Sequence, residues 1–124
     1  MLKVIKHLFQ VSTLFLAIST TIGIAVLSLA KMEGVESSVF NYDKLLHAFA
    51  YCTLSFLWLS AINNSRRTIL ICTVGVIYGI VIEILQMLLT NYRSGDVYDA
   101  LANTTGVLIG YILYKTLAKN YLLK

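Results

Sequence analysis

Residues 78–106, YGIVIEILQMLLTNYRSGDVYDALANTTG, place Glu83 and Gln86 inside an apolar run and follow them with Arg93, two aspartates and an asparagine. A helix rises about 1.5 Å per residue, so roughly 20 apolar residues cross the hydrocarbon core of a bilayer. An ionisable group within such a span is costly in lipid and normally faces protein, water or a partner molecule. The stretch therefore predicts a membrane helix whose few polar groups face other helices.

The whole chain has a composition suited to a bilayer. Hydrophobic residues make up 58% of its 124 residues, charged residues make up 13%, and the mean hydropathy is +0.78. A soluble domain carries roughly 25% charged residues, so a conventional soluble fold is not expected. The formal net charge is +4. No basic groove with interleaved aromatic residues is visible, so nucleic acid is not a predicted partner.

Four segments approach or exceed the length of a membrane span, at approximately residues 8–30, 45–62, 68–90 and 98–118. Helices are the default in lipid because they satisfy their own backbone hydrogen bonds, and the alternating pattern of barrel strands is absent. We therefore predict an all-α integral membrane protein with four transmembrane helices in a small bundle, and residues 1–124 as a single domain. The first segment exceeds the apolar region of a cleaved signal, about 7–15 residues, and is predicted to stay as an anchor. The segment 45–62 is the weakest span and needs its ends at the interface or modest bilayer thinning.

Basic residues concentrate on the side of this arrangement that holds both termini, as expected for cytoplasmic ends. That side carries Lys3, Lys6, Arg66, Arg67, Lys115, Lys119 and Lys124, and the other side carries Lys31, Lys44 and Arg93. All six acidic residues map to the second side. We predict a multi-pass membrane protein with both termini in the cytoplasm. Cys52 and Cys72 are then too far apart for a disulfide and are expected to be free.

Small and polar residues form two matching stripes. They are Gly75, Gly79, Glu83 and Gln86 in the third span, and Asp99, Asn103, Gly106 and Gly110 in the fourth. If NYRSGDV, residues 91–97, turns the chain into a hairpin, pairing Gly79 with Gly106 also sets Glu83 near Asn103. The same register sets Gly75 opposite Gly110 and Gln86 near Asp99. Gly-x-x-x-Gly faces let helices approach closely, so we predict a close contact between these two spans.

The second span brings further polar groups to the same side, because Asp43, Lys44 and His47 lie at its outer end. His47 and the carboxylates can move protons, and Arg93 offers a fixed planar cation suited to phosphate or carboxylate. One interpretation is an acid–base and anion-binding site. The other is structural, with His47 packed, an Arg–Asp salt bridge, and carboxylates capping helices or fastening the hairpin. The capping candidates are Asp43, Asp96 and Asp99.

The spacing of the polar residues gives little support for a metal site or a nucleotide site. Asp, Glu and His side chains are ligands for divalent cations, but their spacing here matches no recognised metal motif. A Gly-rich phosphate loop, a nucleophile elbow and a His-Glu-x-x-His motif are all missing from the sequence. We therefore assign no metal and no cofactor.

Three segments, DKLLHAFAY (43–51), YGIVIEILQ (78–86) and YRSGDVYDALANTTG (92–106), resemble in order and spacing the VanZ-like membrane protein family. The resemblance runs from about Asp43 to Gly110 and leaves out the first span. By this similarity the family's characteristic polar positions are Asp43, Lys44, His47, Glu83, Gln86, Arg93, Asp96, Asp99 and Asn103. The resemblance implies a small multi-span protein of the bacterial cytoplasmic (inner) membrane. The family is named for a member associated with resistance to the glycopeptide antibiotic teicoplanin, and a relationship to enzymes that handle lipid head groups has been proposed for it.

Two functions from different classes follow. The first is an enzyme acting on a phosphate-bearing lipid head group or a lipid-linked cell-envelope precursor at the outer leaflet. Its expected catalytic residues are His47, Glu83, Asp96 and Asp99, and its expected substrate-binding residues are Asp43, Lys44, Gln86, Arg93 and Asn103. The second is a noncatalytic lipid-binding or envelope-modulating protein associated with glycopeptide antibiotic resistance. Transport by one chain is disfavoured because no polar path continues to the cytoplasmic side, although a homo-oligomer would change this.

Overall fold

The structure is a computed structural model that describes residues 1–29, 40–89 and 97–117. Its helices are α1 (Leu2–Leu29), α2 (Phe40–Ile62), the short 3-10 helix η2 (Ser65–Arg67), α3 (Thr68–Leu89) and α4 (Val97–Leu113). A π-helical turn extends α4 to residue 117. Within the described residues there is no strand, which confirms the prediction of an all-helical protein.

Three of these helices are long and apolar enough to cross a membrane: α1, α2 from Lys44, and the continuous η2–α3 segment. The regular part of α4 has 17 residues, which corresponds to about 25 Å and falls short of a full span by itself. The helix α2 begins at Phe40 and has 23 residues, so it starts five residues before the expected segment 45–62.

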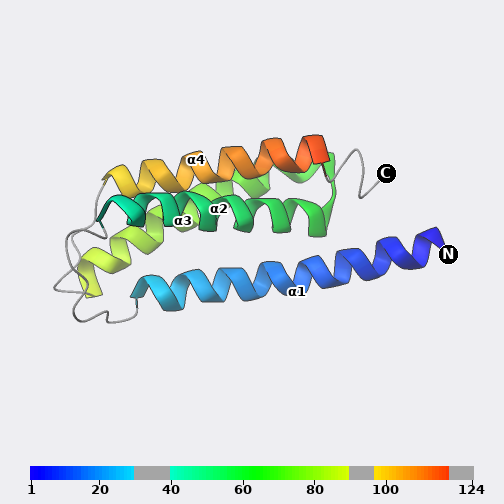
Figure 1. The fold of residues 1–124 in the computed structure, drawn as a ribbon, viewed down its shortest axis with the longest axis horizontal. Coiled ribbons are helices and arrows are strands. Elements are labelled where there is room, and N and C mark those ends of the chain that lie inside the picture. Colours follow the sequence, from blue (N-terminus) through cyan, green and yellow to red (C-terminus); the bar gives the residue numbers. More distant parts are fainter. Residues whose placement is uncertain (30–39, 90–96, 118–124) are drawn as a thin grey trace.

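The helices α2, α3 and α4 form one group, and α1 lies along α2 and α3 without contacting α4 in the described part of the chain (Figure 1). The most extensive packing is between α2 and α4, not between the sequence neighbours α3 and α4. The closest backbone approach occurs at Gly106, where an added Cβ would overlap the Ala48 carbonyl oxygen and would also lie 3.0 Å from the Ala48 carbonyl carbon and the Cys52 amide nitrogen. The added Cβ of Gly110 would likewise meet the Cys52 carbonyl and the Ser55 hydroxyl.

The predicted glycine register between α3 and α4 is therefore wrong. Gly106 and Gly110 face the backbone of α2, and the position opposite Gly79 is taken by Asn103, at 3.1 Å from an added Cβ. Gly75 faces Val107 at 3.4 Å. Relative to the predicted hairpin, α4 is displaced along α3 by three residues, about one helical turn.

Hydrogen bonds attach α1 to its two neighbours. The Trp58 indole nitrogen donates to the Thr21 hydroxyl at 2.9 Å, and the Tyr78 hydroxyl donates to the Thr21 carbonyl oxygen at 2.5 Å. Nearer the end of α1, the Gln86 amide nitrogen donates to the Ser28 carbonyl oxygen at 2.8 Å. Two neighbouring helices thus supply donors to a helix whose own face is mainly apolar.

The connection between α2 and α3 marks one end of the bundle. Asn63 ends α2 with a φ of 44°, a left-handed conformation that asparagine tolerates better than most residues. Its side-chain oxygen accepts a hydrogen bond from the Tyr114 hydroxyl at 2.8 Å, which ties the last turn of the fourth helix to this connection. The first turns of α1 lie at the same end (Figure 1).

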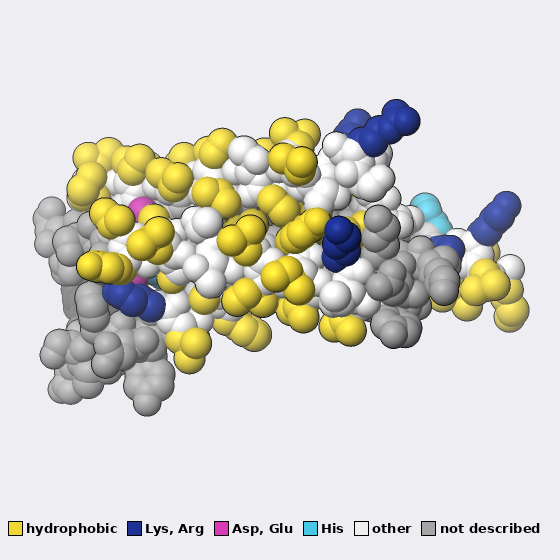
Figure 2. Space-filling view, turned by 90° about the horizontal axis from the view of Figure 1, so that it is seen from above, with side chains coloured by type: hydrophobic (Ala, Val, Ile, Leu, Met, Phe, Trp, Pro, Cys, Tyr) yellow, Lys and Arg dark blue, Asp and Glu magenta, His cyan; other side chains and the backbone are white. Residues whose placement is uncertain are grey.

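Apolar side chains cover the length of the face shown in Figure 2, and Lys and Arg side chains lie towards its two ends. Many of the large apolar residues are exposed, including Phe15, Ile69 and Leu88. This exposed apolar belt is the surface that a bilayer would cover. The polar residues inside the bundle are buried among the helices, not on this belt.

Candidate functional site: a buried His–carboxylate cluster

Three ionisable side chains from three helices meet at the end of the bundle opposite the α2–α3 connection. The Nδ1 atom of His47 in α2 lies 3.8 Å from Glu83 Oε1 in α3 and 3.9 Å from Asp99 Oδ1 in α4. The side chains of these residues are 14%, 8% and 10% exposed, respectively. Their ligand atoms all lie within 4.8 Å of one another. We call His47, Glu83 and Asp99 the three-helix cluster.

Lys44 lies one turn before His47 and borders this cluster. Its Nζ atom is 3.4 Å from Asp99 Oδ1 and 5.9 Å from the centroid of the Tyr98 ring. The Lys44 side chain is 31% exposed, so it is the more accessible member of the polar group. An ammonium in this position attracts an anion to the cluster while keeping part of its own hydration.

A second layer lies one helical turn deeper. Tyr51 follows His47 by four residues, Asn103 follows Asp99 by four, and Gly79 precedes Glu83 by four, so each pair shares a helix face. A Cβ added at Gly79 would lie 3.2 Å from both Asn103 Nδ2 and Tyr51 Cε1. The glycine therefore leaves room for an aromatic and an amide side chain that both come from the faces carrying the cluster.

These two polar side chains are almost completely enclosed. Asn103 is 1% exposed and Tyr51 is 2% exposed. The side-chain amide nitrogen and oxygen of Asn103 have no hydrogen-bond partner among the described residues, and the same is true of the Tyr51 hydroxyl. Buried polar atoms are nearly always paired with protein, water or an ion, so this layer is suited to binding water or a polar ligand.

The other residues expected in the site fall into two groups. Gln86 is buried, and its amide nitrogen bonds to α1 at Ser28, which gives it an anchoring role that the sequence did not suggest. Asp43 lies within the first turn of α2, inside the helix and not at a cap before it, and its side chain is not described. Arg93 and Asp96 lie outside the described residues. Asp99 is in the first turn of α4, where the positive end of the helix dipole stabilises its carboxylate.

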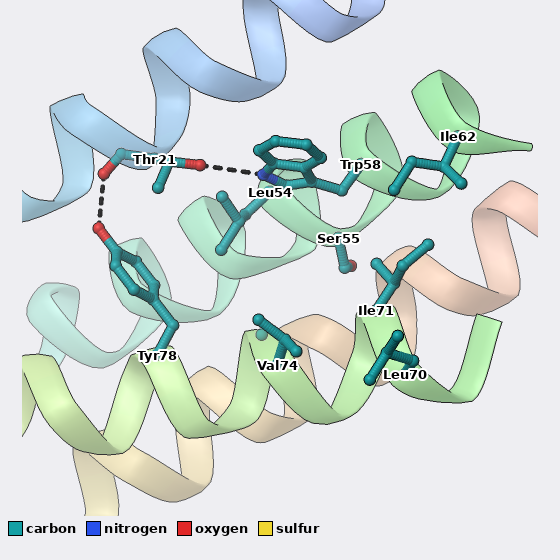
Figure 3. A pocket seen from close by; sticks show the side chains of 10 residues that line it. Thr21, Leu54, Ser55, Trp58, Ile62, Leu70, Ile71, Val74 and Tyr78 are labelled. Atoms are coloured by element: carbon teal, nitrogen blue, oxygen red, sulfur yellow. Dashed lines mark hydrogen bonds between the residues drawn. The ribbon is translucent and has the colours of Figure 1, made fainter. Parts of the chain in front are cut away.

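An apolar cavity of about 310 Å³ lies between α1, α2 and α3 (Figure 3). Thr21 belongs to its wall together with Trp58 and Tyr78, and the hydrogen bonds among these three residues close one side. Ser55 also lines it, but its hydroxyl donates to the Val107 carbonyl oxygen at 3.1 Å. These hydroxyl groups are engaged within the protein, so the cavity suits a hydrocarbon ligand. The sequence did not indicate this cavity, although the spacing of His47, Tyr51 and Trp58 places all three on one face of α2.

A family model described as VanZ/LLP1 matches residues 2–119, which is nearly the whole chain. The chain belongs to the VanZ/LLP1 family. The resemblance seen in its three polar segments is thereby confirmed and extends over the first helix as well. Family membership and the apolar helices together support a membrane protein. The three-helix cluster lies within this VanZ/LLP1 domain.

The comparison with curated proteins adds one similar sequence, the uncharacterized protein C11E3.10 of Schizosaccharomyces pombe. The two are 37% identical over 76 residues, which cover 57% of this chain and 45% of that protein. The aligned region is thus less than half of the yeast protein, whose name states no activity. No solved structure matches the chain.

Proposed function

We propose that this VanZ/LLP1 protein is a membrane enzyme acting on the phosphate-bearing head group of a lipid or of a lipid-linked cell-envelope precursor. The observation that carries the proposal is the position of His47 Nδ1, 3.8 Å from Glu83 and 3.9 Å from Asp99, with the Lys44 ammonium beside Asp99. This arrangement combines an imidazole, two carboxylates and a cation.

In the proposed reaction His47 transfers a proton to or from the head group, because an imidazole flanked by carboxylates is an efficient general acid or base. Glu83 and Asp99 orient the imidazole ring and stabilise its positive charge. Lys44 attracts the phosphate, with Arg93 as a second and bidentate cation. Asp43, Asp96 and Asn103 are proposed to orient head-group atoms or water, while Gln86 contributes through its attachment to α1.

A lipid substrate is supported by the apolar cavity, which begins near Tyr78, five residues before Glu83 along α3. Five residues correspond to about 7.5 Å of helix, so a head group at the cluster leaves an acyl chain at the depth of the cavity. We further propose four membrane spans, a bacterial inner membrane location, cytoplasmic termini, and hence a cluster in the outer leaflet.

A noncatalytic function is the second candidate, and one observation favours it. Glu83 and Asp99 are largely buried and come from different helices, so the same contacts hold three helices together without any reaction. In that case the chain binds a lipid or an envelope component, with glycopeptide resistance as one outcome of such binding.

Turnover separates the two candidates. Purified protein is incubated with defined phospholipids and with undecaprenyl-linked phosphates, and head-group release or transfer is followed by mass spectrometry. His47→Gln, Glu83→Gln and Asp99→Asn preserve side-chain volume and should each lower turnover by about 10²–10⁴-fold, the usual contribution of acid–base catalysis. Lys44→Met should mainly weaken head-group binding.

Two matched controls test the site itself. His7 is the only other histidine and is exposed in α1, so His7→Gln should retain full turnover. Lys115 lies 5.8 Å from the Tyr111 ring, which makes Lys115→Met a counterpart of Lys44→Met away from the cluster. Binding of the lipids without turnover by the wild type would support the noncatalytic candidate. Turnover as fast as that of the wild type in all three cluster variants would contradict the proposed site.

A further inference from the structure

The geometry of the three-helix cluster matches that of a cation held by three ligands. A metal ion in the plane of three ligand atoms, ~2.1–2.2 Å from each, separates those atoms from one another by about 3.6–3.8 Å. His47 Nδ1 lies 3.8 Å from Glu83 Oε1 and 3.9 Å from Asp99 Oδ1. These separations are too long for direct hydrogen bonds between the same atoms. All three pairs of atoms lie within 4.8 Å, so Glu83 and Asp99 approach an ion with a contraction of about 1 Å at most.

We propose that His47, Glu83 and Asp99 bind one divalent cation of the Zn²⁺ or Mn²⁺ type. One imidazole nitrogen favours a first-row transition ion over Ca²⁺ or Mg²⁺, and two carboxylates are ligands for both Zn²⁺ and Mn²⁺. Three protein ligands leave an open position, as in catalytic zinc sites. The sequence spacing did not indicate this site because the three ligands come from three different helices.

The buried layer beneath the cluster supplies an independent observation. Both amide atoms of Asn103 and the Tyr51 hydroxyl are enclosed and have no partner among the described residues. They extend from the same helix faces as Asp99 and His47, one turn deeper. A water on the ion can donate to the Asn103 carbonyl oxygen, and the Asn103 amide or Tyr51 hydroxyl can donate to a ligating carboxylate. Such contacts commonly orient metal ligands.

Charge balance favours the same assignment. A divalent ion neutralises the two carboxylates, which lowers the cost of burying them in a membrane protein. The Lys44 charge is then no longer required to balance Asp99 and can attract a phosphate. The inference rests on the residues of the proposed function and adds a ligand to them, but the ion can be measured with no lipid substrate present.

The experiment is equilibrium metal binding by the full-length protein in detergent after removal of metal by chelation. Mn²⁺ is followed by the loss of the free-ion electron paramagnetic resonance signal, and Zn²⁺ by competition with a chromophoric chelator. We expect one ion per chain at micromolar free metal and a raised thermal unfolding temperature. Asp99→Asn, Glu83→Gln and His47→Gln should weaken binding beyond the ~10–100-fold loss typical for removing an orienting group, and Asn103→Ala should show that smaller loss.

Controls separate a site from general effects. His7→Gln should bind like the wild type, and Lys44→Met should bind at least as tightly because it removes a cation that competes for Asp99. Each variant's folding is checked by size-exclusion profile and thermal unfolding without metal. If neither ion binds the wild type at micromolar concentration, the inference is overturned. It is also overturned if folded cluster variants bind like the wild type, or if Lys44→Met abolishes binding.

The outcome for the proposed function is distinguishable. Stoichiometric binding that depends on the cluster, together with no turnover of any lipid, would support the metal site and contradict the enzyme proposal. Head-group turnover together with no binding of either ion by the wild type at micromolar concentration would support the enzyme proposal and contradict the metal site.

Discussion

The close approach of α2 and α4 is testable by adding a single methyl group at Gly106. A Cβ there would lie 3.0 Å from the Ala48 carbonyl carbon and from the Cys52 amide nitrogen, so it meets backbone that cannot rotate away. Gly23→Ala is the matched change in α1, because an added Cβ at Gly23 has nothing within 4 Å. Gly75→Ala is an intermediate case, with an ordinary contact of 3.4 Å to Val107 Cγ2.

The expected magnitudes follow from these contacts. The Ala48 carbonyl oxygen lies closer to that Cβ than these two atoms, so the two helices must separate by more than the ~0.5–1 Å that contacts at 3.0 Å alone would require. Overpacking of this kind typically costs about 1–3 kcal/mol or more, and the helix propensity of alanine over glycine returns up to ~1 kcal/mol. We expect Gly106→Ala to lower the free energy of unfolding by about 1–3 kcal/mol, and Gly23→Ala to raise it by about 0–1 kcal/mol.

The assay is reversible unfolding of the purified variants in mixed micelles, with the free energy of unfolding extrapolated to native conditions. Gly75→Ala should fall close to the wild type, and Gly106→Ala should be the least stable of the three. Equal stabilities for Gly106→Ala and Gly23→Ala would show that α2 and α4 do not approach as described and would refute the reasoning.

Three further outcomes are expected. Ser55→Ala should lower the free energy of unfolding by about 0.6–1.7 kcal/mol, the range for hydrogen bonds between membrane helices, because the bond to the Val107 carbonyl is lost; an unchanged value would contradict that bond. Trp58 is the only tryptophan and lines the apolar cavity, so its fluorescence should be lower in phospholipids with brominated acyl chains than in the same lipids without bromine. Equal fluorescence in the two lipids would argue against acyl chains in the cavity. Single cysteines at Asn64 and Ser94, in a background lacking the two native cysteines, should be labelled by an impermeant reagent from opposite sides of the membrane, and labelling from one side would refute the proposed four-span topology.

Helix positions in the middle of the chain were predictable to within a few residues. The expected segment 68–90 corresponds to α3 at Thr68–Leu89, because its apolar run is bounded by the two arginines and by polar residues. The start of α2 was missed, since residues 40–44 are too polar to be counted in a span. Hydropathy locates the part of a helix that lies in lipid, whereas backbone hydrogen bonding continues into the interface. Both cysteines are free, as expected.

The meeting of His47, Glu83 and Asp99 was partly predictable, since scarce ionisable groups in apolar helices tend to face one another. The partner of the glycine faces was not. The assumption that a short connection makes α3 and α4 the closest pair placed Gly106 against Gly79, whereas Gly106 faces Ala48 in α2. A stripe of small residues indicates that some helix approaches closely, but the pattern is the same for every candidate neighbour. The attachment of α1 by Trp58 and Tyr78 was missed for a similar reason, because Thr21 bonds them through groups that any helix offers.

During synthesis, α2 leaves the ribosome before its main partner exists. Leu113 follows Ile62 by about 50 residues, so at about 5–20 residues per second the last helix is complete roughly 3–10 s after α2. His47 lacks Glu83 until α3 has been made and lacks Asp99 until α4 has been made, and the α2 backbone that receives Gly106 stays uncovered for the same time. We therefore expect insertion to depend on cellular machinery that shelters a half-polar helix until its carboxylate partners arrive, and a shortage of that machinery to affect this helix before the more uniformly apolar α1.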